Sequence, residues 1–169
     1  MSRGRKTSFA VLAGALALLL VVQVSLVSAR GGPKILQWDT MVGVPAGLTG
    51  TQSLAPLRGI AGGGVPWAVD EASGELRADG RLEIDVEGLV VAASGSNPSG
   101  VFRAIVSCVT STGSFQNILT DAFPATMGPA SAGGGNSKIE TTVTLPSPCI
   151  APIVFVTSNG GSWFASTGS

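Results

Sequence analysis

The chain has 169 residues, with ten basic and ten acidic side chains and neither histidine nor tyrosine. These absences exclude a Ser-His-Asp triad, a Cys-His dyad, an imidazole metal site and phenolic acid–base chemistry. The even charge balance, and the lack of a Lys/Arg cluster after the first six residues, also argue against binding to nucleic acid or anionic lipid.

Residues 1–29 have the features of a secretory signal peptide. Three basic residues precede an almost wholly apolar run, residues 9–27, which is followed by a small-residue ending at Ala29. A run of this length is also long enough to span a bilayer, so an uncleaved anchor at residues 9–27 is the alternative. Both interpretations place residues 30–169 outside the cytoplasm. Seven basic and ten acidic residues follow Ala29, which gives that part a net charge of −3.

Residues 30–169 predict one all-β domain, a β-sandwich of eight or nine short strands, with a β-barrel as the alternative. Short apolar runs are separated by clusters of glycine and proline, and no window after the leader keeps a helical period. The first strand is expected over residues 35–44, an irregular loop over residues 47–64 and a short edge strand at residues 65–69.

The clearest predicted element is a hairpin whose turn is Asp79-Gly80, two residues that we expect at positive φ. In its second arm Leu82, Ile84 and Val86 alternate with charged residues. This period of two predicts one face in the core and one in water. Further strands are expected at residues 101–110, 115–120, 138–145 and 153–157.

Cys108 and Cys149 are the only cysteines of the chain. We predict that they form a structural disulfide in an oxidising compartment, with two separate buried thiols as the alternative. Their spacing is not Cys-x-x-Cys, and no basic neighbour is present to lower a thiol pKa, so the pattern does not indicate a redox-active pair. No catalytic, cofactor-binding or metal-binding residue is predicted.

Acidic residues gather in one short stretch, because seven of the ten carboxylates lie between Asp70 and Glu87. The favoured interpretation is the solvated face of an amphipathic strand. A weak calcium site and a glycosidase carboxylate pair are the alternatives, although alternate strand residues lie about 7 Å apart and no Asp-x-Asp-x-Asp-Gly loop is present. The seven are Asp70, Glu71, Glu75, Asp79, Glu83, Asp85 and Glu87.

Two other motifs receive structural interpretations. Trp38, Trp67 and Trp163 are expected in the core or at its rim rather than on a sugar-binding surface. The glycine run at residues 62–64 is expected to be a flexible connector, because the histidine that usually precedes an oxyanion loop is missing.

Residues 73–89 (SGELRADGRLEIDVEGL) resemble the strand–turn–strand portion of CHRD-type secreted domains, with a glycine, an Asp-Gly turn and a closing Gly-Leu. The histidine-containing motif expected after this portion in that family is absent. A metal role implied by the family therefore has no residue here to carry it. The chain after Ala29 is also similar to small exported bacterial proteins with no assigned activity.

The sequence therefore favours a non-catalytic exported β-sandwich that acts as an extracellular or cell-surface interaction or structural module. The alternatives are a carboxylate-dependent hydrolase acting on polysaccharide and a calcium-stabilised envelope component. The expected partner is extracellular or part of the envelope. We expect no cofactor, no nucleic acid and, once the leader is removed, no membrane contact. A groove with two carboxylates about 5–10 Å apart between apolar walls would favour the hydrolase.

Overall fold

The computed structural model describes residues 31–49 and 56–168. Within these ranges the chain forms nine strands of three or more residues, five strands of two residues and two short 3-10 helices, η1 (Ala46–Leu48) and η2 (Ala130–Ala132). The predicted signal peptide and the alternative anchor at residues 9–27 lie outside the described residues. In the part that the structure describes, no helix has the length and apolar character needed to cross a membrane.

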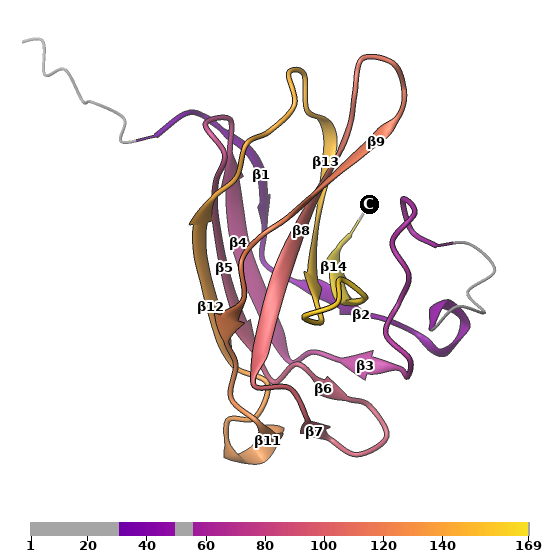
Figure 1. The fold of residues 1–169 in the computed structure, drawn as a ribbon. Coiled ribbons are helices and arrows are strands. Elements are labelled where there is room, and N and C mark those ends of the chain that lie inside the picture. The colour runs from indigo at the N-terminus through magenta and orange to yellow at the C-terminus, as the bar shows by residue number, and fades with distance from the viewer. Residues whose placement is uncertain (1–30, 50–55, 169) are drawn as a thin grey trace, which may run out of the picture.

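Two antiparallel sheets pack face to face as the layers of a sandwich (Figure 1). The first sheet contains, in spatial order, β1 (Lys34–Trp38), β4 (Glu71–Arg77), β5 (Arg81–Glu87) and β12 (Ser137–Thr142). The second sheet contains β10 (Phe123–Pro124), β8 (Val101–Val109), β13 (Ile150–Thr157), β14 (Trp163–Thr167) and β2 (Met41–Gly43), and β9 (Phe115–Leu119) also pairs with β8. A small third sheet contains β11 (Gly128–Pro129), β7 (Ser96–Asn97), β6 (Val90–Val91) and β3 (Trp67–Ala68).

The predicted all-β sandwich is therefore confirmed, and in none of the three sheets do the two outermost strands pair with each other within the described ranges. The nine longer strands agree with the predicted eight or nine. Of the third sheet, which consists of two-residue strands alone, only the edge strand β3 was predicted, within the short edge strand expected at residues 65–69. Its other pairings are too short to leave a period in the sequence.

The core lies between the two sheets and follows the predicted alternation. Leu82, Ile84 and Val86 of β5 are 0 to 2% exposed, whereas the charged residues between them are exposed. The opposite layer contributes apolar residues of β8 and β13 that are also fully buried, among them Phe102 and Val154. Burial of such side chains, at about 1.5–3 kcal/mol each, is the main force that holds the layers together.

The predicted first strand, residues 35–44, is not one strand, and this prediction is corrected. Its first half is β1, which pairs with β4 in the first sheet, and its second half is β2, which pairs with β14 in the second sheet. The chain crosses between layers at Asp39-Thr40 because the two halves find different distant partners. A local pattern cannot distinguish this crossing from a continuous strand.

The predicted hairpin is confirmed, but the conformation of its turn is corrected. Gly80 has a φ of +88°, whereas Asp79 is not at positive φ. The N–H of Gly80 donates to the carbonyl of Arg77 at 2.9 Å, and the strands resume at Arg81. The connection is therefore a three-residue loop that ends in a left-handed glycine, rather than a two-residue turn with two positive φ angles.

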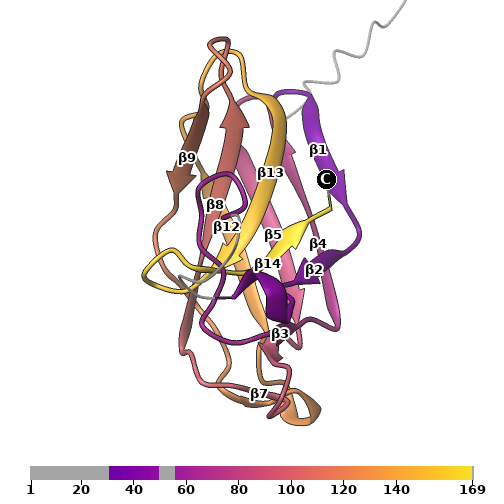
Figure 2. The same cartoon turned by 90° about the vertical axis from the view of Figure 1, so that its right-hand side faces the viewer.

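Of the loop predicted for residues 47–64, the structure describes residues 47–49, where η1 ends, and residues 56–64, which cover the outer face of the second sheet (Figure 2). Ile60 is 6% exposed and joins the core, and the Gly63 N–H donates to the carbonyl of Trp163 at 2.8 Å. A Cβ on Gly62 would overlap the carbonyl oxygen of Leu48. Gly62 and Gly63 are therefore closely packed, in contrast to the flexible connector that we expected, and only Gly64 is exposed with open space around it.

Candidate functional site

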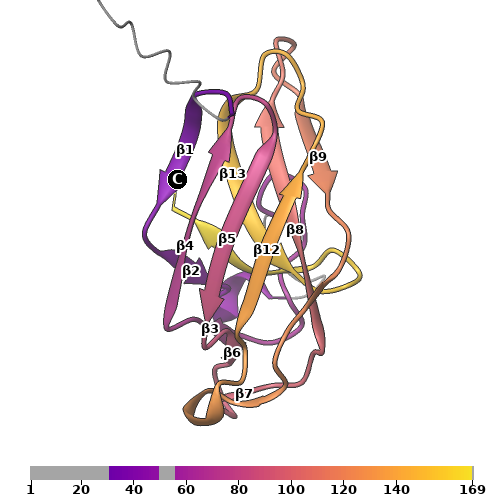
Figure 3. The ribbon, with the colours of Figure 1, turned by 90° about the vertical axis from the view of Figure 1, so that its left-hand side faces the viewer.

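The outer face of the first sheet holds most of the charged side chains singled out in the sequence, and Figure 3 shows this face toward the viewer. In β4 and β5 the charged residues alternate with core residues, so the backbone directs them to solvent. The sequence therefore places these residues correctly. What it does not provide is their cross-strand register.

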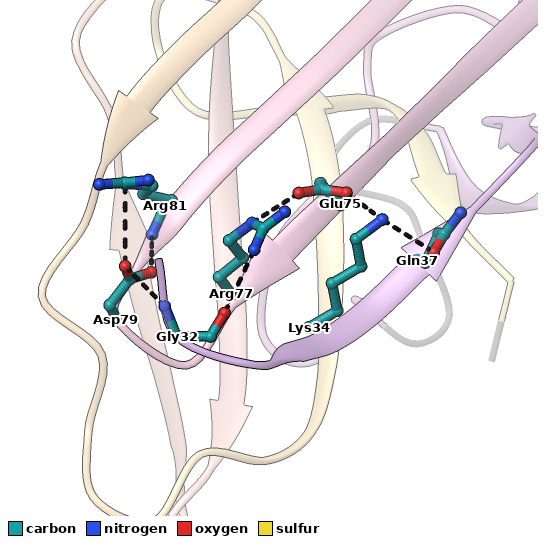
Figure 4. Close-up of polar contacts among 7 residues, drawn as sticks. All are labelled: Gly32, Lys34, Gln37, Glu75, Arg77, Asp79 and Arg81. Atoms are coloured by element: carbon teal, nitrogen blue, oxygen red, sulfur yellow. Dashed lines mark hydrogen bonds and ion pairs between the residues drawn. The ribbon is translucent and has the colours of Figure 1, made fainter. Parts of the chain in front are cut away.

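Glu75 is the centre of an ion-pair network on this face (Figure 4). Its carboxylate lies 2.5 Å from Lys34 Nζ and 2.6 Å from Arg77 Nε. The hydrogen bond from Lys34, reinforced by Arg77, holds the pKa of Glu75 below its ordinary value. This carboxylate is therefore held ionised by its neighbours, which suits a structural ion pair and not a proton donor.

Asp79 has a structural role in the hairpin turn (Figure 4). Its carboxylate accepts hydrogen bonds from the backbone N–H of Gly32 at 3.0 Å and of Arg81 at 3.2 Å, and the Arg81 side chain lies 3.7 Å away. These two backbone hydrogen bonds are the main cause of its lowered pKa. Asp79 thus ties the start of the domain to the turn.

The register of the first sheet places Glu75, Glu83 and Glu140 directly opposite one another on three neighbouring strands. Like charges in such positions destabilise a sheet. The two outer members are compensated: Glu75 by the network above, and Glu140 by Lys138 at 2.8 Å, an interaction that raises the pKa of the lysine. Glu83, between them, projects into solvent.

The other acidic residues do not complete a metal site. Glu71 lies opposite Glu87, and Asp85 lies between Ser73 and Lys138. Within residues 31–49 and 56–168, no three acidic or cysteine side chains converge closely enough to hold a metal ion. The geometry is that of a solvated charged face.

A groove of about 490 Å³ lies at the end of the sandwich between β1, the β4–β5 turn and residues 142–149. Its walls are mixed, with apolar residues such as Ile35, Leu145 and Pro146 beside hydroxyl side chains. Asp79 is the only carboxylate among the described residues that line it. With this one carboxylate, which two backbone N–H groups already bind, the groove lacks the carboxylate pair that a glycosidase needs.

A smaller groove of about 210 Å³ lies over β4 and does gather carboxylates, including Asp39, Glu83 and Asp85. Trp38 is the only large apolar residue of the described part that lines it. Such polar, open walls do not desolvate a carboxyl group, which is the usual way to raise its pKa for acid catalysis.

The predicted disulfide between Cys108 and Cys149 is confirmed. The two Cα atoms lie 4.9 Å apart, and Cys108 is fully buried on the core side of β8. Cys149 lies immediately before β13, so the bond ties β8 to the segment that leads into β13. Because Cys108 is fully buried, the disulfide fits a structural role.

All three tryptophans are buried, as expected for core residues. They are 2 to 8% exposed, and Trp67 stacks on Phe164 with ring centroids 3.8 Å apart. The tryptophans therefore do not form the exposed aromatic surface that sugars require.

Arg58 was not singled out in the sequence, yet it is the most connected side chain of the loop over the second sheet. Its guanidinium donates to the carbonyls of Ser107 at 3.0 Å and Ala151 at 2.7 Å, and lies 5.4 Å from the ring centroid of Phe115. Partial burial lowers its pKa. The one available signal is that Arg58 is the only charged residue between Pro45 and Val69.

Comparison of the chain with protein-family models, curated proteins and solved structures found no match. The resemblance of residues 73–89 to CHRD-type domains stays a prediction. Functional inference therefore depends on the described residues themselves.

Proposed function

We propose that this protein works outside the cytoplasm as a non-catalytic structural or interaction module. Two observations support export: the signal-peptide pattern of residues 1–29 and the disulfide between Cys108 and Cys149. Disulfides persist in oxidising compartments and are rare where thiols are kept reduced.

The observation that best supports a non-catalytic role is the ionised, hydrogen-bonded carboxylate of Asp79. It is the one carboxylate among the described residues that line the groove of about 490 Å³, and two backbone N–H groups and Arg81 hold it ionised. Catalytic carboxyl groups in grooves are usually desolvated and paired with a second carboxyl. The groove therefore supports a structural use of this residue.

The charged face of the first sheet supports a role in solubility or in surface recognition, as opposed to binding of a ligand in a cleft. Its carboxylates are exposed or ion-paired, and its register follows the regular pairing of β4, β5 and β12. A flat, mixed-charge sheet keeps an extracellular domain soluble while its edges and loops make contacts.

Two measurements test the proposal. Cell fractionation with amino-terminal sequencing should find the protein outside the cytoplasm, starting near Arg30 and without free thiols. Purified protein incubated with cell-wall and storage polysaccharides should release no reducing ends above a heat-denatured control. Release that Glu83→Gln abolishes and Glu87→Gln preserves would establish a hydrolase and overturn the non-catalytic assignment.

The structural role of the disulfide gives the largest stability prediction. The cysteines are 41 positions apart, and closing a loop of this length stabilises the fold by about 4 kcal/mol in the loop-entropy description. The double variant Cys108→Ala/Cys149→Ala should lose about that much free energy of unfolding in urea titrations. An unchanged free energy would show that the bond does not stabilise the domain.

A further inference from the structure

The lateral edges of the two main sheets are not equally protected against pairing with another chain. In the first sheet, β1 begins with Lys34 and has an irregular register, and β12 has the charged residues Lys138 and Glu140 on its solvent face. In the second sheet, β2 has three residues and β10 has two, including Pro124. Charge, irregular pairing, proline and shortness are the usual protections of an edge strand.

Strand β9 has no proline, no irregular pairing and no charged residue of its own, and the charge nearest to its start is the Arg58 guanidinium over the ring of Phe115. The strand has five residues (FQNIL), pairs with β8 in continuous register, and lies in an uncharged stretch, residues 104–120. Figures 2 and 3 both show it at the margin of the second sheet. Phe115 and Leu119 are 55% and 42% exposed, whereas Ile118 packs against the core.

The hydrogen bonds at the two ends of the β8–β9 ladder determine which backbone groups of β9 point outward. Thr110 N–H donates to Ser114 O, and Thr120 N–H donates to Ala104 O, both at 2.9 Å. In an antiparallel ladder, bonded and non-bonded pairs alternate. Gln116 and Ile118 therefore bond to β8, and the intervening residues direct their N–H and C=O groups away from it. These outward residues are Phe115, Asn117 and Leu119.

The outward N–H and C=O groups of β9 can pair with the same groups of a second copy. They are centred on Asn117, and an apolar residue lies two positions to either side. A two-fold axis at Asn117 would pair Asn117 with Asn117 of a second copy, and Phe115 with Leu119 of that copy. Every outward N–H then faces a C=O, and each exposed Phe115 packs against a Leu119. A two-fold interface of this kind also closes at the dimer.

We propose that β9 is a self-association edge, at which a second copy of this chain adds its own β9 in antiparallel register and joins the two second sheets. Residues 104–120 contain no charged side chain, so the paired β9 strands themselves oppose no like charges, unlike the glutamates of the first sheet; the nearby Arg58 guanidinium lies over the ring of Phe115. The proposal is independent of whether the domain is catalytic.

Cysteine cross-linking tests the register. Cα atoms of a hydrogen-bonded antiparallel pair lie about 5.5 Å apart, within the range that a disulfide spans. Under mild oxidation the purified Asn117→Cys variant should form a covalent dimer, and its matched control Gln116→Cys should not, because residue 116 is offset from its copy and faces the other side of the sheet. No cross-link at position 117, or equal cross-linking at both positions, would overturn the proposal.

Sedimentation of the uncross-linked protein tests the association itself. The wild type should show a concentration-dependent monomer–dimer equilibrium, and Leu119→Lys should weaken it at least about tenfold, which is about 1.4 kcal/mol. Met127→Lys is the matched control, since Met127 is 62% exposed and lies outside β9. A monomer at every concentration, growth into filaments, or equal weakening by both lysine variants would contradict the proposed edge.

Discussion

The β4–β5 and β8–β9 hairpins have similar turns, but their strands differ in burial. Each connects neighbouring antiparallel strands through a turn with a glycine at positive φ, +88° at Gly80 and +81° at Gly113. In the first hairpin both arms have one face in the core and one in water. In the second, β8 is buried on both faces through its middle, whereas β9 has no fully buried residue.

The difference arises from what covers each strand. The first sheet packs on one face of β8, and the loop with Arg58 and Ile60 covers the other face. Strand β9 lies at the margin of both coverings, where Ile118 packs against the core. Asn117 Nδ2 donates to the carbonyl of Arg58 at 3.1 Å, and the Arg58 guanidinium lies over the ring of Phe115. The local sequence therefore determines that a hairpin forms. The elements packed around it determine which of its residues are buried and stabilise the fold, and which stay exposed for contacts.

The largest expected difference in the free energy of unfolding is between a leucine of the first hairpin and a leucine of the second. Leu82 in β5 is 0% exposed, and Leu119 in β9 is 42% exposed. Leu82→Ala should lower the free energy of unfolding by about 3 kcal/mol, because it removes buried methyl groups and leaves a cavity, and Leu119→Ala by less than about 0.5 kcal/mol. Urea titrations at a concentration where the protein is monomeric measure both. Equal losses would show that β9 is covered in solution.

The two turn glycines have different surroundings. A Cβ on Gly80 would overlap the carbonyl oxygen of Val143, whereas nothing lies within 4 Å of one on Gly113. Gly113→Ala should cost about 1 kcal/mol from its left-handed conformation alone, and Gly80→Ala about 2–3 kcal/mol, because the contact with Val143 is lost as well. Thermal and urea unfolding of the two variants provide the values. Matching losses would mean that the β4–β5 turn does not dock on residue 143.

Alternation, turn residues and apolar runs are local properties, and they predicted the β4–β5 hairpin, the β8 and β13 strands and the disulfide partners. They could not predict the division of residues 35–44 between two sheets, because pairing with β4 and β14 depends on distant segments. They also missed Arg58, whose partners lie 49 and 93 positions away. At the candidate site, the charged face was predictable, but the row of opposed glutamates depends on a register that no local pattern contains.

A smaller effect is expected from the pH dependence of Glu75. Lys34 and Arg77 lower its folded-state pKa, so its contribution to stability is present above about pH 4.3, the ordinary glutamate value, and is lost as the pH falls through the lowered pKa. Glu75→Gln should therefore lose less stability than the wild type between about pH 5 and pH 3. Urea unfolding across this range measures the loss. Glu87→Gln serves as the control, since Glu87 makes no ion pair within the described ranges.

The most direct test of the account concerns Glu83, the central carboxylate of the charged face. If this face is a solvated structural surface, Glu83→Gln should change the free energy of unfolding by less than about 0.5 kcal/mol, with the same value in calcium and in chelator. A gain in wild-type stability of more than about 1 kcal/mol on adding calcium, lost in Glu83→Gln, would contradict the account and make the acidic face a cation site.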